Sequence, residues 1–270
     1  MKLISLTDLS AADIRSIWTL AGKPAARLSG NVAWSFEGNG IRTRSTFLQA
    51  FRALNLEYIE LPNLLKTSER ACDIAGYLDP LYDFYVIRES NHARLAEFAI
   101  ASRRPVINAM SSDGHPCEVL TDAYYIDSVL MPIERARICL WGPTTNVFRS
   151  WHELAAVLKL QLVHVCDSRF HRDLPHVVFT DKPDSTADVV ITDGWSKEID
   201  AADWSLTEQH LAAMGNPKLL PTPPFIIGRE LSFDPCGYDG FTGYEQKKLL
   251  VPVQIAVLLH MANCRQDTRS

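Results

Sequence analysis

The sequence lacks several features that would assign the chain to a common class. Its 270 residues carry a net charge of −5, so there is no basic excess of the kind that nucleic-acid-binding proteins usually show. No segment approaches the roughly 20 consecutive apolar residues that a membrane helix needs. We therefore expect neither a nucleic-acid partner nor a membrane span.

Cysteine pairs and leader-like segments are also missing. The six cysteines are scattered and form no C-x-x-C pair, which argues against a zinc ribbon or a disulfide framework and favours reduced thiols. Residues 1–22 lack a sustained apolar run before a small-residue cleavage site, so we expect no signal peptide and a cytoplasmic protein. The segment "LWGPTTNVF" lacks the glycines of G-x-G-x-x-G, which disfavours a dinucleotide dehydrogenase.

What is present is the pattern of an ordinary α/β protein. Hydrophobic residues make up 47% and charged residues 22% of the chain, enough for a substantial core. Short apolar runs alternate with longer helix-patterned stretches, which indicates crossover connections and parallel sheets covered on both faces. The strands are expected at residues 31–36, 57–62, 84–88, 105–109, 135–142, 160–167, 176–181, 188–193 and 218–223.

The alternation occurs in two series and predicts two lobes, each a parallel sheet flanked by helices, joined by helices. The first lobe is expected to comprise residues 1–127, and the second residues 128–242. The segment 243–263 is mostly helix-patterned and is expected to pack back on the first lobe. Pro252 lies near its start and is expected to start or kink that helix.

Two arginines follow the first predicted strand. The stretch "FEGNGIRTRSTF", residues 36–47, leads into a helix pattern at 45–55. Backbone N–H groups and the helix dipole favour an anion at a helix N-terminus. Arg42 and Arg44 can add donor forks suited to phosphate oxygens, and Thr43 can add a hydroxyl. Taken alone, the stretch fits a solvated helix start with surface arginines equally well.

Three further segments could carry chemistry, each with an ordinary structural alternative. Arg88 ends an apolar strand, where ligands of parallel sheets bind, although an arginine there could simply leave the core for solvent. His115 opens a helix and could polarise a carbonyl oxygen, although a lone histidine is more often structural. Leu220 and Pro221 are expected to follow a strand and expose backbone carbonyls to a ligand amide, or to form a plain proline-rich loop.

In their order along the chain, these segments resemble the aspartate and ornithine carbamoyltransferase family. The family's F-E-x-x-S-T-R-T-R loop is matched by "FEGNGIRTR", residues 36–44, and its H-P-x-Q by "HPCE", residues 115–118. The family's swinging loop resembles "LKTSERACD", with Lys66 at the lysine that reaches into a neighbouring subunit's site. Its second-lobe motifs resemble, in turn, "LWGPTTNVFRS", "ADVVITD" and "LLPTPPFIIGRE". The resemblance covers nearly the whole chain.

The resemblance implies transfer of a carbamoyl group from carbamoyl phosphate to an amine, without a metal, a cofactor or a covalent intermediate. By resemblance, the phosphate is held by Gly40, Ile41, Arg42 and Thr43, with Lys66 contributed by a neighbour.

The same resemblance assigns the carbamoyl group and the acceptor. Arg88 and His115 hold the carbonyl oxygen, and Arg88 also reaches the phosphate. Glu118 and the Leu220 carbonyl hold the carbamoyl NH2. The acceptor is assigned to Asn146, Asp193 and Pro221.

Asn146 matches the asparagine of ornithine-type members, where aspartate-type members carry an arginine. We therefore predict an amine or amino-acid acceptor other than aspartate, in a homotrimer with sites at subunit interfaces.

Three positions of these motifs depart from the family pattern. Ile41 replaces a threonine, a smaller concern if that position contributes mainly its backbone N–H. The other two bear directly on donor affinity. Gly40 replaces a serine whose hydroxyl would be worth about 1.5–3 kcal/mol to a bound anion. Glu118 replaces a glutamine, and a carboxylate about 5 Å from a phosphate charge repels it by roughly 3 kcal/mol per unit charge. We therefore expect serine at position 40 and glutamine at position 118 to improve donor affinity. Two alternatives stay open: a member that binds ligand without transfer, as a regulatory subunit, and a transferase that uses another acyl phosphate donor.

Overall fold

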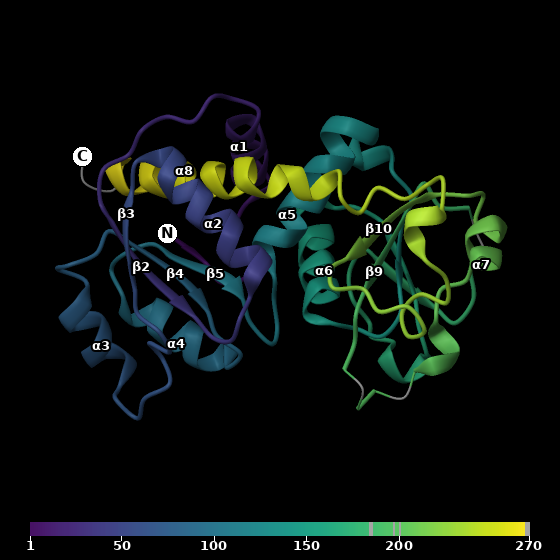
Figure 1. Ribbon diagram of the computed structural model, residues 1–270, viewed down its shortest axis with the longest axis horizontal. Coiled ribbons are helices and arrows are strands. Elements are labelled where there is room, and N and C mark those ends of the chain that lie inside the picture. Colours follow the sequence, from purple (N-terminus) through teal and green to yellow (C-terminus); the bar gives the residue numbers. More distant parts are fainter. Residues whose placement is uncertain (184–185, 197, 200, 268–270) are drawn as a thin grey trace. The chain divides into compact units, whose positions relative to one another are not determined.

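Two parallel sheets organise the chain in the computed structural model, which describes residues 1–183, 186–196, 198–199 and 201–267. The chain divides into two units. The first is Met1–Leu120 together with the C-terminal segment from Leu249, and the second is Thr121–Lys248. Each unit is built on its own five-stranded sheet (Figure 1).

The first sheet has the strand order β1–β5–β4–β2–β3, and its neighbours pair in parallel. Its strands are β1 (Lys2–Leu3), β2 (Asn31–Phe36), β3 (Glu57–Glu60), β4 (Phe84–Arg88) and β5 (Val106–Met110). The helices of this unit are α1 (Ala11–Ala21), α2 (Ile41–Leu54), α3 (Ala71–Leu78), α4 (His92–Ala101) and α8 (Leu250–Asp267).

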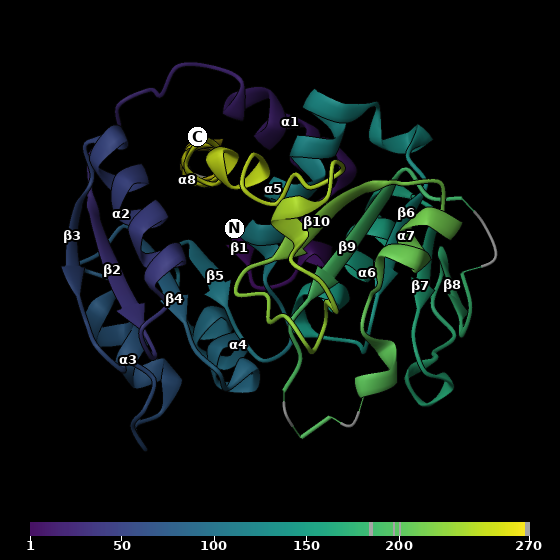
Figure 2. The same cartoon turned by 45° about the vertical axis from the view of Figure 1, so that its right-hand side comes forward.

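Helices cover both faces of the first sheet, with α1, α2 and α8 on one side and α3 and α4 on the other (Figures 1 and 2). Burial of β2 on both faces of the sheet explains why its residues are apolar in succession. Ala33 belongs to the core cluster formed with α3 and α4, whereas the Trp34 ring packs against Phe47 and Phe51 of α2. Because both faces are buried, the strand reads as a continuous apolar run.

Helix α8 comes from the far end of the chain and lies along α1 and α2. His260 Nε2 on α8 lies 3.1 Å from Asp13 Oδ1 on α1, which ties the two helices together. Pro252 is the third residue of α8 and lies in its first turn, where a missing N–H costs no helical hydrogen bond.

The second sheet has the order β10–β9–β6–β7–β8 and is also parallel. Its strands are β6 (Ile138–Trp141), β7 (Leu162–Val165), β8 (Val177–Thr180), β9 (Val189–Asp193) and β10 (Lys218–Thr222). The second unit also contains α6 (Asn146–Leu158) and α7 (Glu208–Ala213). Helix α5 (Pro116–Tyr125) runs across the division between the two units.

The α/β fold with two helix-flanked parallel sheets is confirmed, and a strand is found at each predicted position. The sequence interpretation missed β1 and α1, and it began α2 four residues late, at Ser45 instead of Ile41. None of the helices in the described part of the chain has the length and hydropathy needed to cross a membrane.

Two expectations for Leu220 and Pro221 conflicted, and one of them is wrong. Both residues lie within β10, paired with Ile191 and Thr192 of β9, as the strand expected at residues 218–223 predicts, and they do not follow the strand. Proline is tolerated there because β10 is the edge of the sheet, so the missing N–H breaks no ladder to a second strand.

Candidate active site

The residues predicted to bind the donor follow the carboxyl ends of three neighbouring strands. Strands β2, β4 and β5 end at Phe36, Arg88 and Met110, and they are adjacent in the first sheet. Because the carboxyl ends of parallel strands lie at one edge, the loops that follow them meet there. The structure therefore brings the start of α2, Arg88 and the start of α5 to one edge of the first unit (Figure 2).

The start of α2 presents backbone N–H groups. Gly40 is the residue before the helix, with φ 39° and ψ 35°, and no side chain among the described residues caps the helix. The Arg44 N–H makes the first helical bond, to the Gly40 carbonyl at 2.8 Å. The N–H groups of residues 41–43 therefore have no acceptor within the helix. Together with the helix dipole, they favour an anion at this end.

The guanidinium of Arg88 lies beside this helix start. Its Nη1 would be 3.1 Å from a Cβ atom built on Gly40. Burial lowers the pKa of Arg88 and the charge of Arg42 lowers it further, while Glu37 acts in the opposite direction. Two arginines that repel one another beside exposed N–H groups form a positive site, and a bound anion would relieve that repulsion.

Arg44 of the same loop is directed elsewhere. Arg44 forms an ion pair with Glu60 at 2.5 Å, and its guanidinium lies 5.1 Å from the centre of the Phe36 ring. Thr43 is buried, and the Ile41 side chain is 65% exposed. The guanidinium of Arg44 is thus occupied by Glu60 and Phe36, and Arg42 is the other arginine of the loop that could bind an anion.

His115 and Glu118 lie at the start of α5, and both are buried, with exposed fractions of 8% and 7%. The preceding turn is fixed by Ser111, whose Oγ accepts from Asn108 Nδ2 at 3.0 Å and lies 2.8 Å from His92 Nδ1. These three residues were missed from the sequence. The available signal was Asn108, an amide inside an otherwise apolar strand, which must find partners when buried.

Lys66 lies at the same edge and is paired within its own chain. Its Nζ is 2.6 Å from Glu89 Oε1 and 3.2 Å from Glu37 Oε1. Hydrogen bonds from Ser90, reinforced by Lys66, lower the pKa of Glu37 to about 2. Sequence reasoning missed Glu89, and the predicted contact of Lys66 with a neighbouring subunit stays a prediction.

The residues predicted to bind the acceptor lie in the second unit. Asn146 is the first residue of α6, and its Oδ1 accepts from the Val147 N–H at 3.0 Å. The loop before it contacts the first of two buried histidines that pair with each other. His164 Nε2 lies 2.8 Å from the Gly142 carbonyl, and His164 Nδ1 lies 3.1 Å from His152 Nε2.

Asp193 ends β9 and lies opposite Thr222, the last residue of β10. It is therefore one strand away from Leu220 and Pro221, at the carboxyl edge of the second sheet. Asn146 follows β6, which is the other neighbour of β9, so the residues predicted to bind the acceptor belong to the carboxyl-terminal parts of three adjacent strands or follow them.

A second carboxylate, Glu230, lies near Asp193 and was not predicted. Glu230 is fully buried, its carboxylate accepts from the Ile226 N–H, and burial raises its pKa. Its Oε1 would be 3.5 Å from a Cβ built on Gly194, the residue after Asp193. No sequence pattern marked Glu230, because its burial arises from the folding of the loop after β10.

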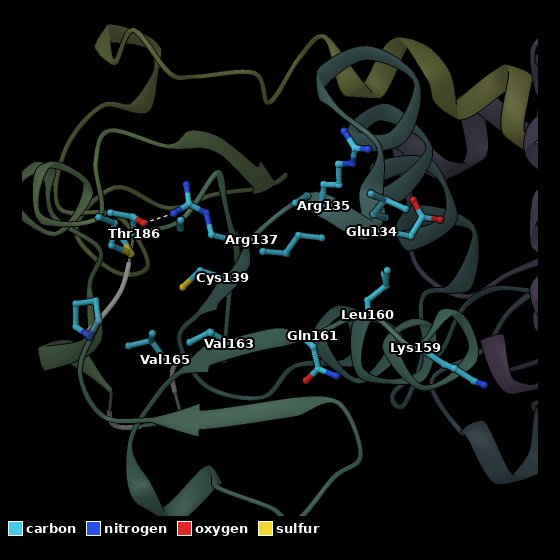
Figure 3. A pocket seen from close by; sticks show the side chains of 16 residues that line it. Glu134, Arg135, Arg137, Cys139, Lys159, Leu160, Gln161, Val163, Val165 and Thr186 are labelled. Atoms are coloured by element: carbon cyan, nitrogen blue, oxygen red, sulfur yellow. Dashed lines mark hydrogen bonds between the residues drawn. The ribbon is translucent and has the colours of Figure 1, made fainter.

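A cavity of about 410 Å³ lies at the other end of the second sheet (Figure 3). Its walls include Cys139 and Leu160, near the amino ends of β6 and β7, and Val163 and Val165 on β7. Arg137 at its edge forms an ion pair with Asp188. None of the predicted site residues is among the described residues that line this cavity.

The described part of the chain contains no group of three or more His, Cys, Asp or Glu side chains placed to hold a metal ion.

Comparisons with known proteins agree with this arrangement. The family model described as "Aspartate/ornithine carbamoyltransferase, carbamoyl-P binding domain" matches residues 1–128. Among curated proteins, the ornithine carbamoyltransferase of Bradyrhizobium diazoefficiens is 32% identical over 211 residues, which cover 72% of this chain and 68% of that protein. The ornithine carbamoyltransferase of Caulobacter vibrioides is 31% identical over 176 residues, covering 59% of this chain and 57% of that protein.

Solved structures extend the similarity over the whole fold. The anabolic ornithine carbamoyltransferase of Campylobacter jejuni has a TM-score of 0.85 at 25% identity and covers 97% of this chain and 99% of its own. The ornithine carbamoyltransferase of Pyrococcus furiosus has a TM-score of 0.87 at 22% identity, covering 95% of each chain. The predicted family and enzyme class are thereby confirmed, and the chain belongs to the aspartate/ornithine carbamoyltransferase family.

Proposed function

We propose that this protein transfers the carbamoyl group of carbamoyl phosphate to an amine or amino acid other than aspartate and releases phosphate. The observation that carries the proposal is the positive site in the first unit, where Arg88 and Arg42 lie beside the uncapped start of α2. A phosphate needs several donors that converge from fixed positions, and this edge supplies backbone N–H groups and guanidinium groups together.

In the proposed reaction, the neutral amine attacks the carbonyl carbon and a tetrahedral oxyanion forms. The C–O bond to the phosphate then breaks, and the phosphate leaves with the proton that the amine nitrogen gives up. Arg42 and the N–H groups of residues 41–43 hold the phosphate. Arg88 and His115 donate to the carbonyl oxygen, where negative charge develops in the transition state. The buried position of His115 favours this role, because donors act more strongly where water is excluded.

The acceptor is assigned to the second unit. Asn146 and Asp193 offer an amide and a carboxylate at the ends of adjacent strands, a combination that suits an amino acid with its carboxylate and ammonium groups. Ornithine is the first acceptor to test, because the similar curated proteins are named ornithine carbamoyltransferases.

One observation favours a ligand-binding role without transfer. Glu118 is buried close in sequence to His115, and a carboxylate there repels a donor phosphate and cannot supply an N–H group. The alternative is a regulatory subunit that holds ligand in the same place.

The test is calorimetric titration with carbamoyl phosphate, followed by phosphate release with ornithine and a panel of other amines. Arg42→Ala should weaken donor binding about 10- to 100-fold, since it removes charged hydrogen bonds to phosphate. The matched control is Arg52→Ala, which removes an exposed arginine from the other end of α2 and should leave the affinity unchanged. No binding of carbamoyl phosphate by the wild type would refute the proposal, and binding without turnover on every amine would favour the regulatory alternative.

The family resemblance also predicts a homotrimer. Light scattering of the purified protein after size exclusion measures its mass directly. A monomer that is fully active would overturn the prediction that subunits share the site.

A further inference from the structure

Two histidines inside the second unit form a hydrogen-bonded chain that ends on the backbone of the loop before α6. His152 on α6 and His164 on β7 are both buried, with exposed fractions of 8% and 0%. His164 Nε2 lies 2.8 Å from the Gly142 carbonyl oxygen, and His164 Nδ1 lies 3.1 Å from His152 Nε2. Two buried imidazoles cost more to place than two apolar side chains, and the proposed reaction gives neither ring a chemical role.

The partners of His164 fix the direction of both hydrogen bonds. Burial lowers the pKa of His152 to about 3 and that of His164 to about 4, so each ring is neutral at physiological pH and carries one N–H. A carbonyl oxygen can only accept, so the N–H of His164 is at Nε2. Its Nδ1 is then an acceptor, and His152 Nε2 donates to it. His152 thereby selects the tautomer of His164 that donates to the loop.

Aromatic side chains hold both imidazole rings in place. The centre of the Phe179 ring on β8 lies 5.5 Å from that of His152 and 5.0 Å from that of His164. The Phe148 ring on α6 meets the His164 ring edge to face, with their centres 5.2 Å apart. Because the rings cannot turn freely among these neighbours, the His164 N–H keeps its direction toward the loop.

Gly142 receives this bond, and β7 holds both of its backbone polar groups. The Gly142 N–H donates to the Val165 carbonyl at 2.9 Å, and the Gly142 carbonyl accepts from His164. The next residue is Pro143, so the peptide unit between them has no N–H and the carbonyl is its only polar group. Gly142 has φ 116°, a conformation that side chains rarely adopt. Without the His164 bond, nothing in this peptide unit would fix the turn of a flexible glycine.

Gly142 touches both segments that carry the predicted acceptor residues. Asn146 starts α6 four residues after it. A Cβ atom built on Gly142 would lie 2.9 Å from the ring of Trp195, which is 5% exposed and follows Asp193 by two residues. A shift of Gly142 would therefore move the start of α6 and the segment after β9 together. A misplacement of about 1 Å can cost an enzyme about 100-fold in rate.

We propose that His164 is a positioning residue for the acceptor: its Nε2–H holds the Gly142 carbonyl and so sets the places of Asn146 and Asp193. His152 supports it by keeping the proton at Nε2. The inference rests on the proposed function for the role of Asn146 and Asp193, and it gives neither histidine a contact with a substrate.

The test compares two amides at position 164 that differ in the bond they keep. Glutamine carries an N–H at the same distance along the side chain as Nε2 and can donate to Gly142, whereas the shorter asparagine can accept from His152 but cannot reach Gly142. With ornithine as acceptor, His164→Asn should raise the acceptor KM about ten-fold, and His164→Gln should stay within about three-fold of the wild type. His164→Leu removes the same bond without burying an amide and should match His164→Asn.

The affinity for the donor separates positioning from general loosening of the fold. Calorimetric titration with carbamoyl phosphate should give the same affinity in all three variants, because the lost bond lies in the second unit and the residues predicted to hold the phosphate lie in the first. A loosened fold would weaken both substrates together.

His171→Asn is the matched control. His171 Nε2 also lies beside a backbone carbonyl, that of Cys166 at 3.1 Å, and its ring also packs against Phe179, with centres 5.7 Å apart. The Cys166 carbonyl does not belong to the loop before α6. The acceptor KM of this variant should therefore equal that of the wild type.

Three results would overturn the inference. The first is an acceptor KM in His164→Asn and His164→Leu equal to that of the wild type. The second is a glutamine variant as impaired as the asparagine variant, since the bond to Gly142 would then not be what matters. The third is a parallel loss of donor affinity.

A wild type that releases no phosphate with ornithine would contradict the proposed function for that acceptor, and hydrogen exchange followed by mass spectrometry then decides the inference alone. The amides of residues 144–149 and 193–196 must exchange faster in His164→Asn than in the wild type and in His164→Gln. Equal exchange in the three proteins would show that His164 does not hold these segments.

Discussion

Serine at position 40 should lower both the stability of this protein and its affinity for the donor, although the family's loop carries serine there. Gly40 has φ 39°, a left-handed conformation that side chains rarely adopt. A Cβ atom built on it would lie 2.9 Å from the Phe36 ring and 3.1 Å from Arg88 Nη1. A serine side chain would therefore strain the backbone, crowd the buried Phe36 ring and crowd Arg88, the arginine predicted to hold the donor.

The cost follows from these contacts. A left-handed residue with a side chain costs about 1–2 kcal/mol relative to glycine. The Phe36 ring cannot move away freely, because it is 3% exposed and its centre lies 4.1 Å from that of Trp34, so the crowding adds about 1–3 kcal/mol. Gly40→Ser should therefore lower the free energy of unfolding by about 2–5 kcal/mol.

Gly40→Ala is the matched control, since it brings the same Cβ without the hydroxyl. Urea unfolding should show a similar loss for both variants, and calorimetric titration should show donor binding weaker than wild type in both. A hydroxyl that reaches the phosphate would make the serine variant bind about 10- to 100-fold more tightly than the alanine variant. A serine variant that is as stable as the wild type and binds the donor more tightly would refute this reasoning and support the expectation drawn from the sequence.

Three further predictions concern buried titratable groups. Burial lowers the pKa of His152 to about 3 and that of His164 to about 4, whereas a histidine in the unfolded chain has a pKa of about 6.5. Below pH 6.5 the unfolded chain therefore binds more protons than the folded one, and the free energy of unfolding in urea should fall by about 2 kcal/mol per ring between pH 7.5 and 5. His152→Leu should halve that fall. Burial raises the pKa of Glu230, so its ionised form opposes folding as the pH rises above the ordinary carboxyl range; Glu230→Gln should raise the free energy of unfolding at pH 8 by about 1 kcal/mol, and a loss of several would mean that the charge is paired. Glu118→Gln should tighten donor binding about ten-fold or more in calorimetry, and unchanged affinity would place Glu118 away from the phosphate.

The sheets could be predicted from the sequence because their signal is local. An apolar run between turn residues, followed by a helix pattern, identifies a crossover unit wherever it occurs. The misses were elements with little local signal. Strand β1 has two residues, and its place in the sheet comes from pairing with β5, more than a hundred residues away. Leu220 and Pro221 were assigned both to a strand at residues 218–223 and to the loop after a strand, because proline suggests a loop, whereas an edge strand tolerates it.

The candidate site was predictable in outline, since a motif preserves residue types at fixed spacing. What the sequence does not contain is the partner of each side chain. Glu89 and Glu230 belong to no motif, and their importance arises from burial beside Lys66 and beside the end of β9. From the sequence, Gly40 differs from the family's serine only by a missing hydroxyl. The structure shows in addition that its backbone is left-handed, with φ 39°.

Arg42 and Arg44 show the same limit within a single motif. The two residues are of one type and lie two positions apart in the first turn of α2. At 3.6 residues per turn, their side chains leave the helix about 200° apart, so they cannot serve the same ligand. Arg44 is directed to Glu60 and Phe36, while the charge of Arg42 acts on Arg88. The repeated arginines of the motif therefore divide into one that binds the rest of its own unit and one that lies on the side of Arg88, where we propose that the donor phosphate binds, a division set by helix geometry.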